Sequence, residues 1–312
     1  MLSSWFARRR RLKSGWLAVC PAQDGVALAA LGAVSGRPRL EWATFAEGKE
    51  LDLAALAKAH GLSAWRLVTL LAPGSYQLVQ MNAPAVPRTE WKEALRWQLK
   101  DFIDFPVEQA SFDVLEIPTE AYAPGRPTSV YVVVAANQQV APVMQRFDRL
   151  RLALKVIDIP ELALRNVAAR LEEENRGLAL LAFDAGGGLL VITFKGELYA
   201  SRRIEISLAQ FSQADGERRQ ALFERIGLEL QRTLDAFDRQ YSFISIARLL
   251  LAPRPELGGL IDYLASSLYV PVEAMDLSER IDLSAVPALK QPVEQSRYLF
   301  ALGAALRPEE AA

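Results

Sequence analysis

The chain has 312 residues, and its 36 Lys and Arg residues almost balance its 37 Asp and Glu residues, giving a formal net charge of −1. This balance argues against nucleic-acid binding, because phosphate binding needs an excess of basic residues. The single cysteine, Cys20, excludes an intramolecular disulfide and a thiolate zinc site, and the single histidine, His60, argues against a His-based catalytic triad. At roughly 150 residues per domain, the length predicts about two domains.

The N-terminus places two aromatic residues before a basic run. A secretory signal would put its positive charges before the apolar stretch. The most uniformly apolar run, residues 26–34, is far shorter than the roughly 20 residues that a membrane-spanning helix needs. We therefore expect a cytoplasmic protein. Attraction between basic residues and anionic lipids makes the N-terminus a candidate for contact with the membrane surface. The residues concerned are Trp5, Phe6, Arg8, Arg9, Arg10 and Arg11.

The first part of the chain is expected to form a strand meander, a helix and a further strand. Short apolar segments separated by turn residues predict the strands. They cover residues 16–20, 25–31 and 39–45, the helix covers residues 51–59 and the last strand covers residues 66–71. His60 is expected to end the helix and to have no catalytic role, because a cationic residue followed by glycine favours a helix C-terminus.

The middle of the chain follows a different order of elements. Strands are expected at residues 76–81, 111–117 and 128–136, and helices at residues 89–104 and 138–152, with residues 122–127 forming a loop. This β-α-β-β-α block predicts a small inserted domain. The expected division is therefore residues 1–75, 76–158 and 159–312.

The helix at residues 89–104 has one apolar stripe. Trp91, Leu95, Leu99 and Phe102 recur at a spacing of three to four residues, so we expect them to pack against the inserted sheet. Trp97 lies off this stripe and is expected to be exposed.

The last part repeats the order of the first. Expected strands at residues 178–183, 189–194 and 197–204 precede a long helix at residues 215–241 and a strand at residues 247–251. A helix at residues 160–174 leads into this part, and another at residues 257–268 follows it. A meander, a helix and a strand occurring twice predict an α/β fold with two ribonuclease-H-like halves, as in actin and sugar kinases.

Four segments in order resemble PilM-type proteins, which are actin-like cytoplasmic components of type IV pilus assembly. The segments are residues 86–106, 156–166, 229–237 and 298–307. The sequence Leu-Arg-Trp-Gln-Leu-Lys-Asp-Phe-Ile-Asp-Phe-Pro at residues 95–106 is most similar to the MshI branch, which serves the mannose-sensitive haemagglutinin (MSHA) pilus.

The resemblance implies an ATP site between the halves, with one hairpin from each half around the phosphates and Mg²⁺. In the second half, Asp184, Gly186, Gly187 and Gly188 keep the family's Asp-x-Gly form, so they are candidates for a vestigial phosphate loop. The other interpretation is a Gly-rich turn that serves the fold alone.

Two other nucleotide motifs depart from the family pattern. Aligned with the family, Cys20 takes the place of the first Asp and Ala27 that of a Lys, while residues 252–255, Ala-Pro-Arg-Pro, replace a Gly-Gly pair. A thiol is a poor substitute for a carboxylate beside Mg²⁺, which prefers oxygen ligands. We expect ATP–Mg²⁺ binding to be weak or absent, with no ATPase activity, no other cofactor and no metal site.

The resemblance also implies a peptide-binding role. The N-terminal tail of a bitopic inner-membrane protein, similar to PilN, is expected to dock in a groove between the first half and the inserted domain. Candidate partner-binding residues are Trp97, Phe102, Phe105 and Pro106. For Phe102 this is the alternative to packing against the inserted sheet. The function expected is a non-catalytic scaffold, peripheral at the inner membrane. The alternatives are an active actin-like ATPase of pilus assembly and the cytoplasmic domain of a type II secretion platform protein, which normally continues into a membrane span.

Overall fold

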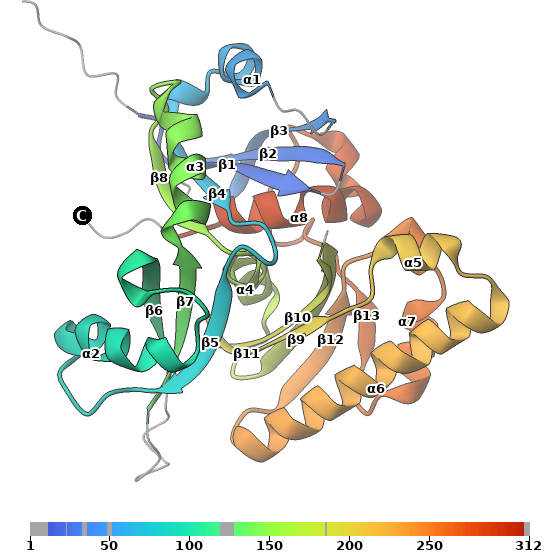
Figure 1. Cartoon of the computed structure of the whole chain (residues 1–312). Coiled ribbons are helices and arrows are strands. Elements are labelled where there is room, and N and C mark those ends of the chain that lie inside the picture. Colours follow the sequence, from blue (N-terminus) through green and yellow to red (C-terminus); the bar gives the residue numbers. More distant parts are fainter. Residues whose placement is uncertain are drawn as a thin grey trace, which may run out of the picture.

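Two five-stranded sheets with the same strand order form the two halves of the molecule (Figure 1). The first sheet consists of β1 (Trp16–Ala22), β2 (Gly25–Gly32), β3 (Arg39–Glu47), β4 (Arg66–Leu70) and β8 (Leu154–Asp158). The second consists of β9 (Gly177–Asp184), β10 (Gly187–Phe194), β11 (Glu197–Ile204), β12 (Ile246–Leu251) and β13 (Val272–Ala274). The orders are β3-β2-β1-β4-β8 and β11-β10-β9-β12-β13.

The strand directions also repeat. In each sheet the first three strands form an antiparallel meander, and the fourth and fifth strands run parallel to the first. This is the ribonuclease-H-like arrangement, present twice. The predicted duplication is therefore confirmed at the level of strand order and direction.

The computed structural model describes residues 12–22, 24–32, 36–48, 52–118, 128–184 and 186–308. The N-terminal residues expected to contact a membrane, Trp5, Phe6 and Arg8 to Arg11, lie outside the described residues. The expected loop at 122–127 and Ala185 of the candidate phosphate loop also lie outside them. Within the described part, no helix combines the length and the apolarity needed to cross a bilayer.

A third sheet of three strands projects from the first half. Its strands are β5 (Gln77–Asn82), β6 (Ala110–Ile117) and β7 (Ser129–Ala136), in the order β5-β7-β6. Helix α2 (Trp91–Gln98) packs on it, with Leu95 and Leu99 fully buried against Val130, Val132 and Val134. With α3 (Asn137–Asp148), the order β5-α2-β6-β7-α3 is the predicted β-α-β-β-α block.

Helix α3 and strand β8 pack with the first half, although both lie in the range expected for the inserted domain. Phe147 of α3 is buried with Leu17, Leu28 and Leu67 beneath the first sheet, and β8 pairs with β4. A strand parallel to its neighbour needs a crossover connection, usually a helix. Helix α3 ends the crossover from β4 to β8, and the three-stranded sheet lies within that connection.

Helices α4 (Pro160–Leu171) and α8 (Pro292–Ala305) cross between the halves (Figure 1). Helix α4 packs on β9 and β10 of the second sheet, whereas α8 packs on β1 and β2 of the first. At their crossing, a Cβ atom on Gly303 would lie 2.1 Å from the carbonyl oxygen of Ala163. The buried Asn166 amide donates a hydrogen bond of 2.9 Å to the carbonyl of Gly303. The close crossing therefore depends on a residue without a side chain.

The remaining described helices each belong to one of the two halves. They are α1 (Leu53–His60), α5 (Leu208–Gln213), α6 (Gly216–Gln240) and α7 (Leu260–Ser267). The apolar stripe of α6 is buried and includes Ile226, Leu230 and Phe237. His60 ends α1 before a left-handed Gly61, and its ring stacks on Trp42 at 4.9 Å.

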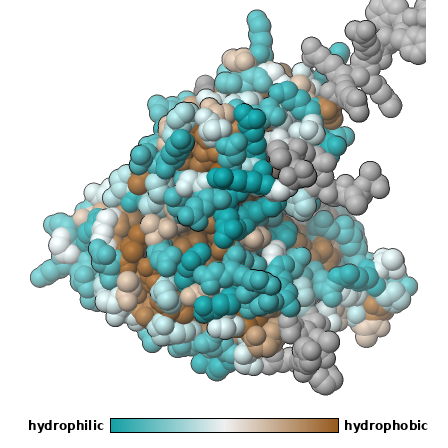
Figure 2. Space-filling model, turned by 180° about the vertical axis from the view of Figure 1, so that it is seen from behind, coloured by the Kyte–Doolittle hydropathy of each residue, from teal (hydrophilic) through white to brown (hydrophobic). Residues whose placement is uncertain are grey.

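Seen from behind, hydrophilic residues cover most of the molecular surface, and apolar residues are exposed in separate patches (Figure 2).

Candidate functional site: the cleft between the halves and the α1–α3 groove

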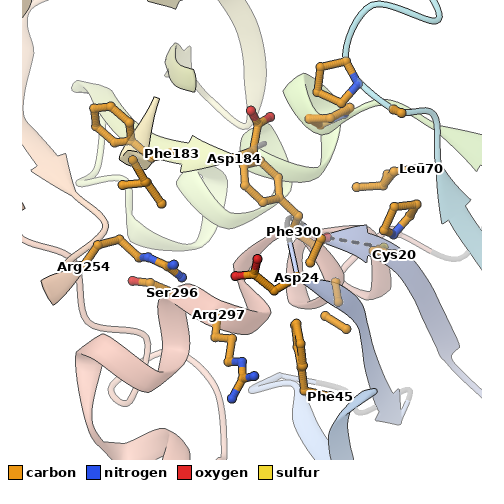
Figure 3. Close-up of a pocket in the computed structure, with 18 of the residues that line it drawn as sticks. Cys20, Asp24, Phe45, Leu70, Phe183, Asp184, Arg254, Ser296, Arg297 and Phe300 are labelled. Atoms are coloured by element: carbon orange, nitrogen blue, oxygen red, sulfur yellow. Dashed lines mark hydrogen bonds between the residues drawn. The ribbon is translucent and has the colours of Figure 1, made fainter. Parts of the chain in front are cut away.

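A cavity of about 460 Å³ lies between the two halves. The turn between β1 and β2 and the end of β4 line it from the first half. The end of β9, the loop after β12 and helix α8 complete it. Asp24 and Asp184 reach it from opposite halves, with Arg254 and Arg297 at its sides (Figure 3). The family resemblance implied that two phosphate-binding hairpins would meet here, and we call this cavity the cleft.

Cys20 contributes a neutral, buried thiol to the cleft. Its exposed fraction is 1%, and its Sγ lies 4.0 Å from the carbonyl oxygen of Phe300. Burial raises the pKa of the thiol, with a smaller contribution from the nearby Asp158 carboxylate. A protonated thiol brings neither the negative charge nor the hard oxygen ligands that a carboxylate at this position would offer to Mg²⁺. Ala27, beside it in the lining, brings no charge.

Asp24 is a cleft residue that the sequence reasoning missed. It lies in the turn after β1 and lines the cavity (Figure 3). Matching the first half to the family motif directed attention to Cys20, four residues earlier. The structural repeat explains its position: Ala22 pairs with Gly25 as Asp184 pairs with Gly187, so Asp24 occupies the place in the first hairpin turn that Gly186 occupies in the second. The sequence motif gave no signal for it, because Asp24 corresponds to a glycine of the second hairpin and not to Asp184.

The oxygens of Asp184 are held by protein groups. The Arg203 guanidinium donates to Oδ2 at 2.6 Å, and the backbone N–H of Gly186 donates to Oδ1 at 2.7 Å. Arg203 also donates to Glu161 at 3.1 Å and to the hydroxyl of Tyr76 at 3.2 Å. The Tyr76 hydroxyl in turn donates to Glu161. Asp184 is thus one end of a network that joins α4, β11 and the segment before β5.

Burial and the neighbouring carboxylates set the protonation states of Arg203 and Tyr76. Burial opposes the charge on Arg203, but Glu161 and Asp184 more than compensate and raise its pKa. Burial, followed by the Glu161 carboxylate, raises the pKa of Tyr76, so its hydroxyl keeps its proton. A permanently charged guanidinium therefore stands beside Asp184, the carboxylate that the family motif would assign to a hydrated metal.

The glycines of the candidate phosphate loop have packing reasons of their own. Gly187 has a φ of 112°, and a Cβ there would lie 2.6 Å from the carbonyl oxygen of Ile204. A Cβ on Gly186 would lie 2.7 Å from the side chain of Pro73 in the first half, and one on Gly188 would lie 3.1 Å from Cβ of Ile204. The glycine run is therefore accounted for by the fold without a phosphate.

The charges that line the cleft are mostly carboxylates. Arg254 pairs with Glu256 at 3.6 Å, and Arg297 pairs with Glu47 at 2.9 Å while lying 3.8 Å above the ring of Phe45. The described lining residues include no lysine. Across the described ranges, no group of three or more His, Cys, Asp or Glu residues is arranged to hold a metal ion. The four carboxylates of the lining are Asp24, Asp184, Glu256 and Glu294.

A second concave region lies on the other side of the first sheet, between α1 and α3. Two adjoining cavities of about 150 Å³ and 380 Å³ share the lining residues Leu53, Pro142 and Arg146. We call the pair the α1–α3 groove. Its inner cavity is lined by side chains from the first sheet and from α3, and its outer cavity opens between the two helices. The apolar side chains of the inner cavity include Val19, Val26, Leu70, Val143 and Phe147.

The four predicted partner-binding residues lie around the end of α2. Trp97 is 68% exposed as expected, with the Lys100 ammonium 4.4 Å from its ring centre. Phe105 is half-buried against the core of the inserted sheet, and Pro106 is exposed. None of the four lines the cleft or the α1–α3 groove. Their role in binding stays a prediction.

The predicted burial of Phe102 is wrong. Its side chain is 50% exposed, although the spacing put it on the stripe with Leu95 and Leu99. The α-helix was expected to run to residue 104, but it ends at Gln98 and continues as a tighter 3₁₀ turn over Leu99–Asp101. A 3₁₀ turn has 3.0 residues per turn rather than 3.6, so the residue after it is rotated away from the α-helical stripe.

Comparison with known proteins bears on the fold. No family model matches the chain, and no curated protein matches it by sequence. A chain of the PilM–PilN type IV pilus biogenesis complex is similar with a TM-score of 0.75 and 22% identity, covering 95% of this chain and 98% of that one. The cytoplasmic domain of EpsL, an inner-membrane component of the type II secretion system of Vibrio cholerae, is similar with a TM-score of 0.50 and 17% identity, covering 91% and 94%. The chain therefore has the actin-like fold, a duplicated ribonuclease-H-like α/β architecture with a small inserted domain.

Proposed function

We propose that this protein is a PilM-like, non-catalytic cytoplasmic scaffold of a type IV pilus assembly platform at the inner membrane. The observation that carries the proposal is the structural likeness, over 95% of the chain, to a protein of the PilM–PilN complex. The amino-acid sequence of residues 95–106 supports the finer assignment to the MshI branch. The aromatic and basic residues of the N-terminus are suited to contact with anionic lipids.

The partner we propose is the short cytoplasmic tail of a PilN-like bitopic membrane protein, bound in the α1–α3 groove. This groove lies between the first sheet and α3, the last helix of the β-α-β-β-α block. Its inner wall is apolar, as suits the side chains of a docked peptide. The helix end around Trp97 is the other candidate surface, since it exposes two aromatic side chains.

Blocking the groove at its mouth should weaken the binding of this partner. Ala54 is exposed on α1 and lines the outer cavity, so an indole at this position would fill the space without entering the core. With the tail peptide of the membrane protein that co-purifies with the tagged chain, we expect Ala54→Trp to lower affinity about tenfold or more, which is about 1.4 kcal/mol. Fluorescence anisotropy measures this.

Two further variants make the result specific. Ala55→Trp adds the same side chain at the next exposed position of α1, which does not line the groove, and should bind normally. If Ala54→Trp binds like the wild type while Trp97→Ala loses the peptide, the docking surface is the end of α2 and not the groove.

We further propose that the cleft does not serve as an ATPase site. The support is the neutral Cys20, the engagement of both Asp184 oxygens and the pairing of both cleft arginines with carboxylates. Isothermal titration with ATP and Mg²⁺ is expected to show no saturable binding below about 1 mM. Actin titrated under the same conditions is the positive control. Micromolar saturable binding that needs Mg²⁺ would overturn this part of the proposal.

A second candidate function is the cytoplasmic part of a type II secretion platform protein. The likeness to the EpsL cytoplasmic domain favours it, although the TM-score of 0.50 is lower than the 0.75 for the PilM–PilN complex. Mass spectrometry of the membrane proteins that co-purify with the tagged chain separates the two. Pilus assembly proteins support the first candidate, and secretion components support the second.

A further inference from the structure

The charged side chains that line the α1–α3 groove are all positive. Its described lining residues are apolar or uncharged polar except for two arginines, Arg146 and Arg149, and none of them is a carboxylate. Both arginines are exposed, and they lie three residues apart at the C-terminal end of α3, which puts them on one side of the helix. The groove thus combines an apolar inner cavity with a basic mouth.

Neither guanidinium has a partner among the described residues. No hydrogen bond, ion pair or ring contact is made by the side chain of Arg146 or Arg149, whereas the cleft arginines are each paired with a carboxylate. The carboxylate at the start of α1, Asp52, accepts a hydrogen bond of 2.9 Å from the N–H of Ala55 and caps that helix. It lies outside the groove lining.

A helix C-terminus favours basic residues by about 0.3–1 kcal/mol, and this accounts for arginines near the end of α3. It does not account for their place at the mouth of a concave, otherwise uncharged surface. Two guanidiniums held near each other repel, and a single carboxylate between them relieves the repulsion while accepting planar N–H donors.

The lining of the inner cavity favours apolar side chains of a ligand. Its one hydroxyl, on Thr69, is buried and donates to the carbonyl of Val19 at 2.6 Å. The other side chains at this end are aliphatic or aromatic, apart from Arg146 at the junction with the outer cavity. A volume of about 150 Å³ has room for few side chains, so the apolar part of a ligand is short.

We propose that the segment bound in the α1–α3 groove carries an Asp or Glu side chain that pairs with Arg146 and Arg149, beside a short aliphatic stretch that enters the inner cavity. This inference rests on the proposed function, which places a peptide in the groove. It adds the charge of that peptide and the residues that select it.

Selection of a random peptide display library on the full chain tests the inference. Peptides enriched by the wild type are expected to contain an acidic residue next to aliphatic ones. The best such peptide should lose affinity about three- to tenfold on the Arg146→Gln/Arg149→Gln double variant, the range of partly exposed ion pairs. Selection on Arg146→Glu/Arg149→Glu should instead enrich Lys or Arg. The control Arg170→Glu/Arg218→Glu makes the same charge change at exposed positions away from the groove and should select as the wild type does.

The outcomes separate this inference from the proposed function. Peptides that are lost in Ala54→Trp, but show no acidic preference and no response to the arginine variants, overturn the inference and leave the groove as the docking site. Peptides that bind Ala54→Trp and wild type equally, or a library that yields no groove-dependent peptide, count against both.

Discussion

Gly303→Ala is expected to destabilise the protein by about 3 kcal/mol or more, although it adds a single methyl group. The new Cβ would lie 2.1 Å from the carbonyl oxygen of Ala163 and 2.7 Å from its carbonyl carbon, so a backbone has to move. Helices α4 and α8 would separate, and the buried hydrogen bond from Asn166 to Gly303 would lengthen with them. Because these helices pack on different sheets, the strain reaches both halves. Urea unfolding followed by circular dichroism measures the loss.

The matched control is Gly216→Ala. Gly216 is also helical, at the start of α6, but a Cβ there meets no atom within 4 Å. The Gly216→Ala variant should be more stable than the wild type by up to about 1 kcal/mol, because alanine has a higher helix propensity than glycine. Equal unfolding midpoints for the two variants would mean that the α4–α8 crossing is not tightly packed in solution.

Arg203→Met is expected to lower the free energy of unfolding by about 3–5 kcal/mol at pH 7, the usual cost of removing one partner from a buried ion pair. Glu161 and Asp184 would remain buried without their shared cation. The desolvation cost of the two carboxylates would then be left without the ion pairs that offset it. Urea unfolding at pH 7 measures the loss.

Arg202→Met is the control for this variant. Arg202 is the preceding residue of β11 and pairs with Glu229 at 3.2 Å, but its side chain is 57% exposed. An exposed pair of this kind contributes about 0–1 kcal/mol, so the loss should be small. If Arg203→Met is no less stable than Arg202→Met, the network around Asp184 does not hold the second-half hairpin.

Most of the secondary structure could be predicted because it is encoded locally. The apolar stripe of α6 and the strands of both meanders repeat at the spacing of their own element, so each can be read without its neighbours. The recurrence of that order then predicted the duplicated fold. The same local reasoning failed at Phe102, because the change from an α-helix to a 3₁₀ turn at Leu99 alters the spacing on which the prediction relied.

The candidate sites depend on residues that are distant in the sequence. Sequence similarity drew attention to Asp184 and to the glycines after it, but Arg203 reaches Asp184 from another strand, and Asp24 enters the cleft from the other half. The family resemblance implied a groove between the first half and the inserted domain, but the residues that line the α1–α3 groove could not be predicted, because α1 and α3 are separated by an entire inserted sheet.

The sequence by itself determined the elements, their order, the duplication and the scarcity of cysteine and histidine. Only the tertiary structure decided that β8 completes the first sheet, that Gly303 allows α4 and α8 to cross, and that Arg146 and Arg149 stand at the mouth of an apolar groove. The physical reason is that hydrophobic periodicity shows which face of an element is buried, whereas side-chain pairing and concave surfaces arise only when separate elements pack together.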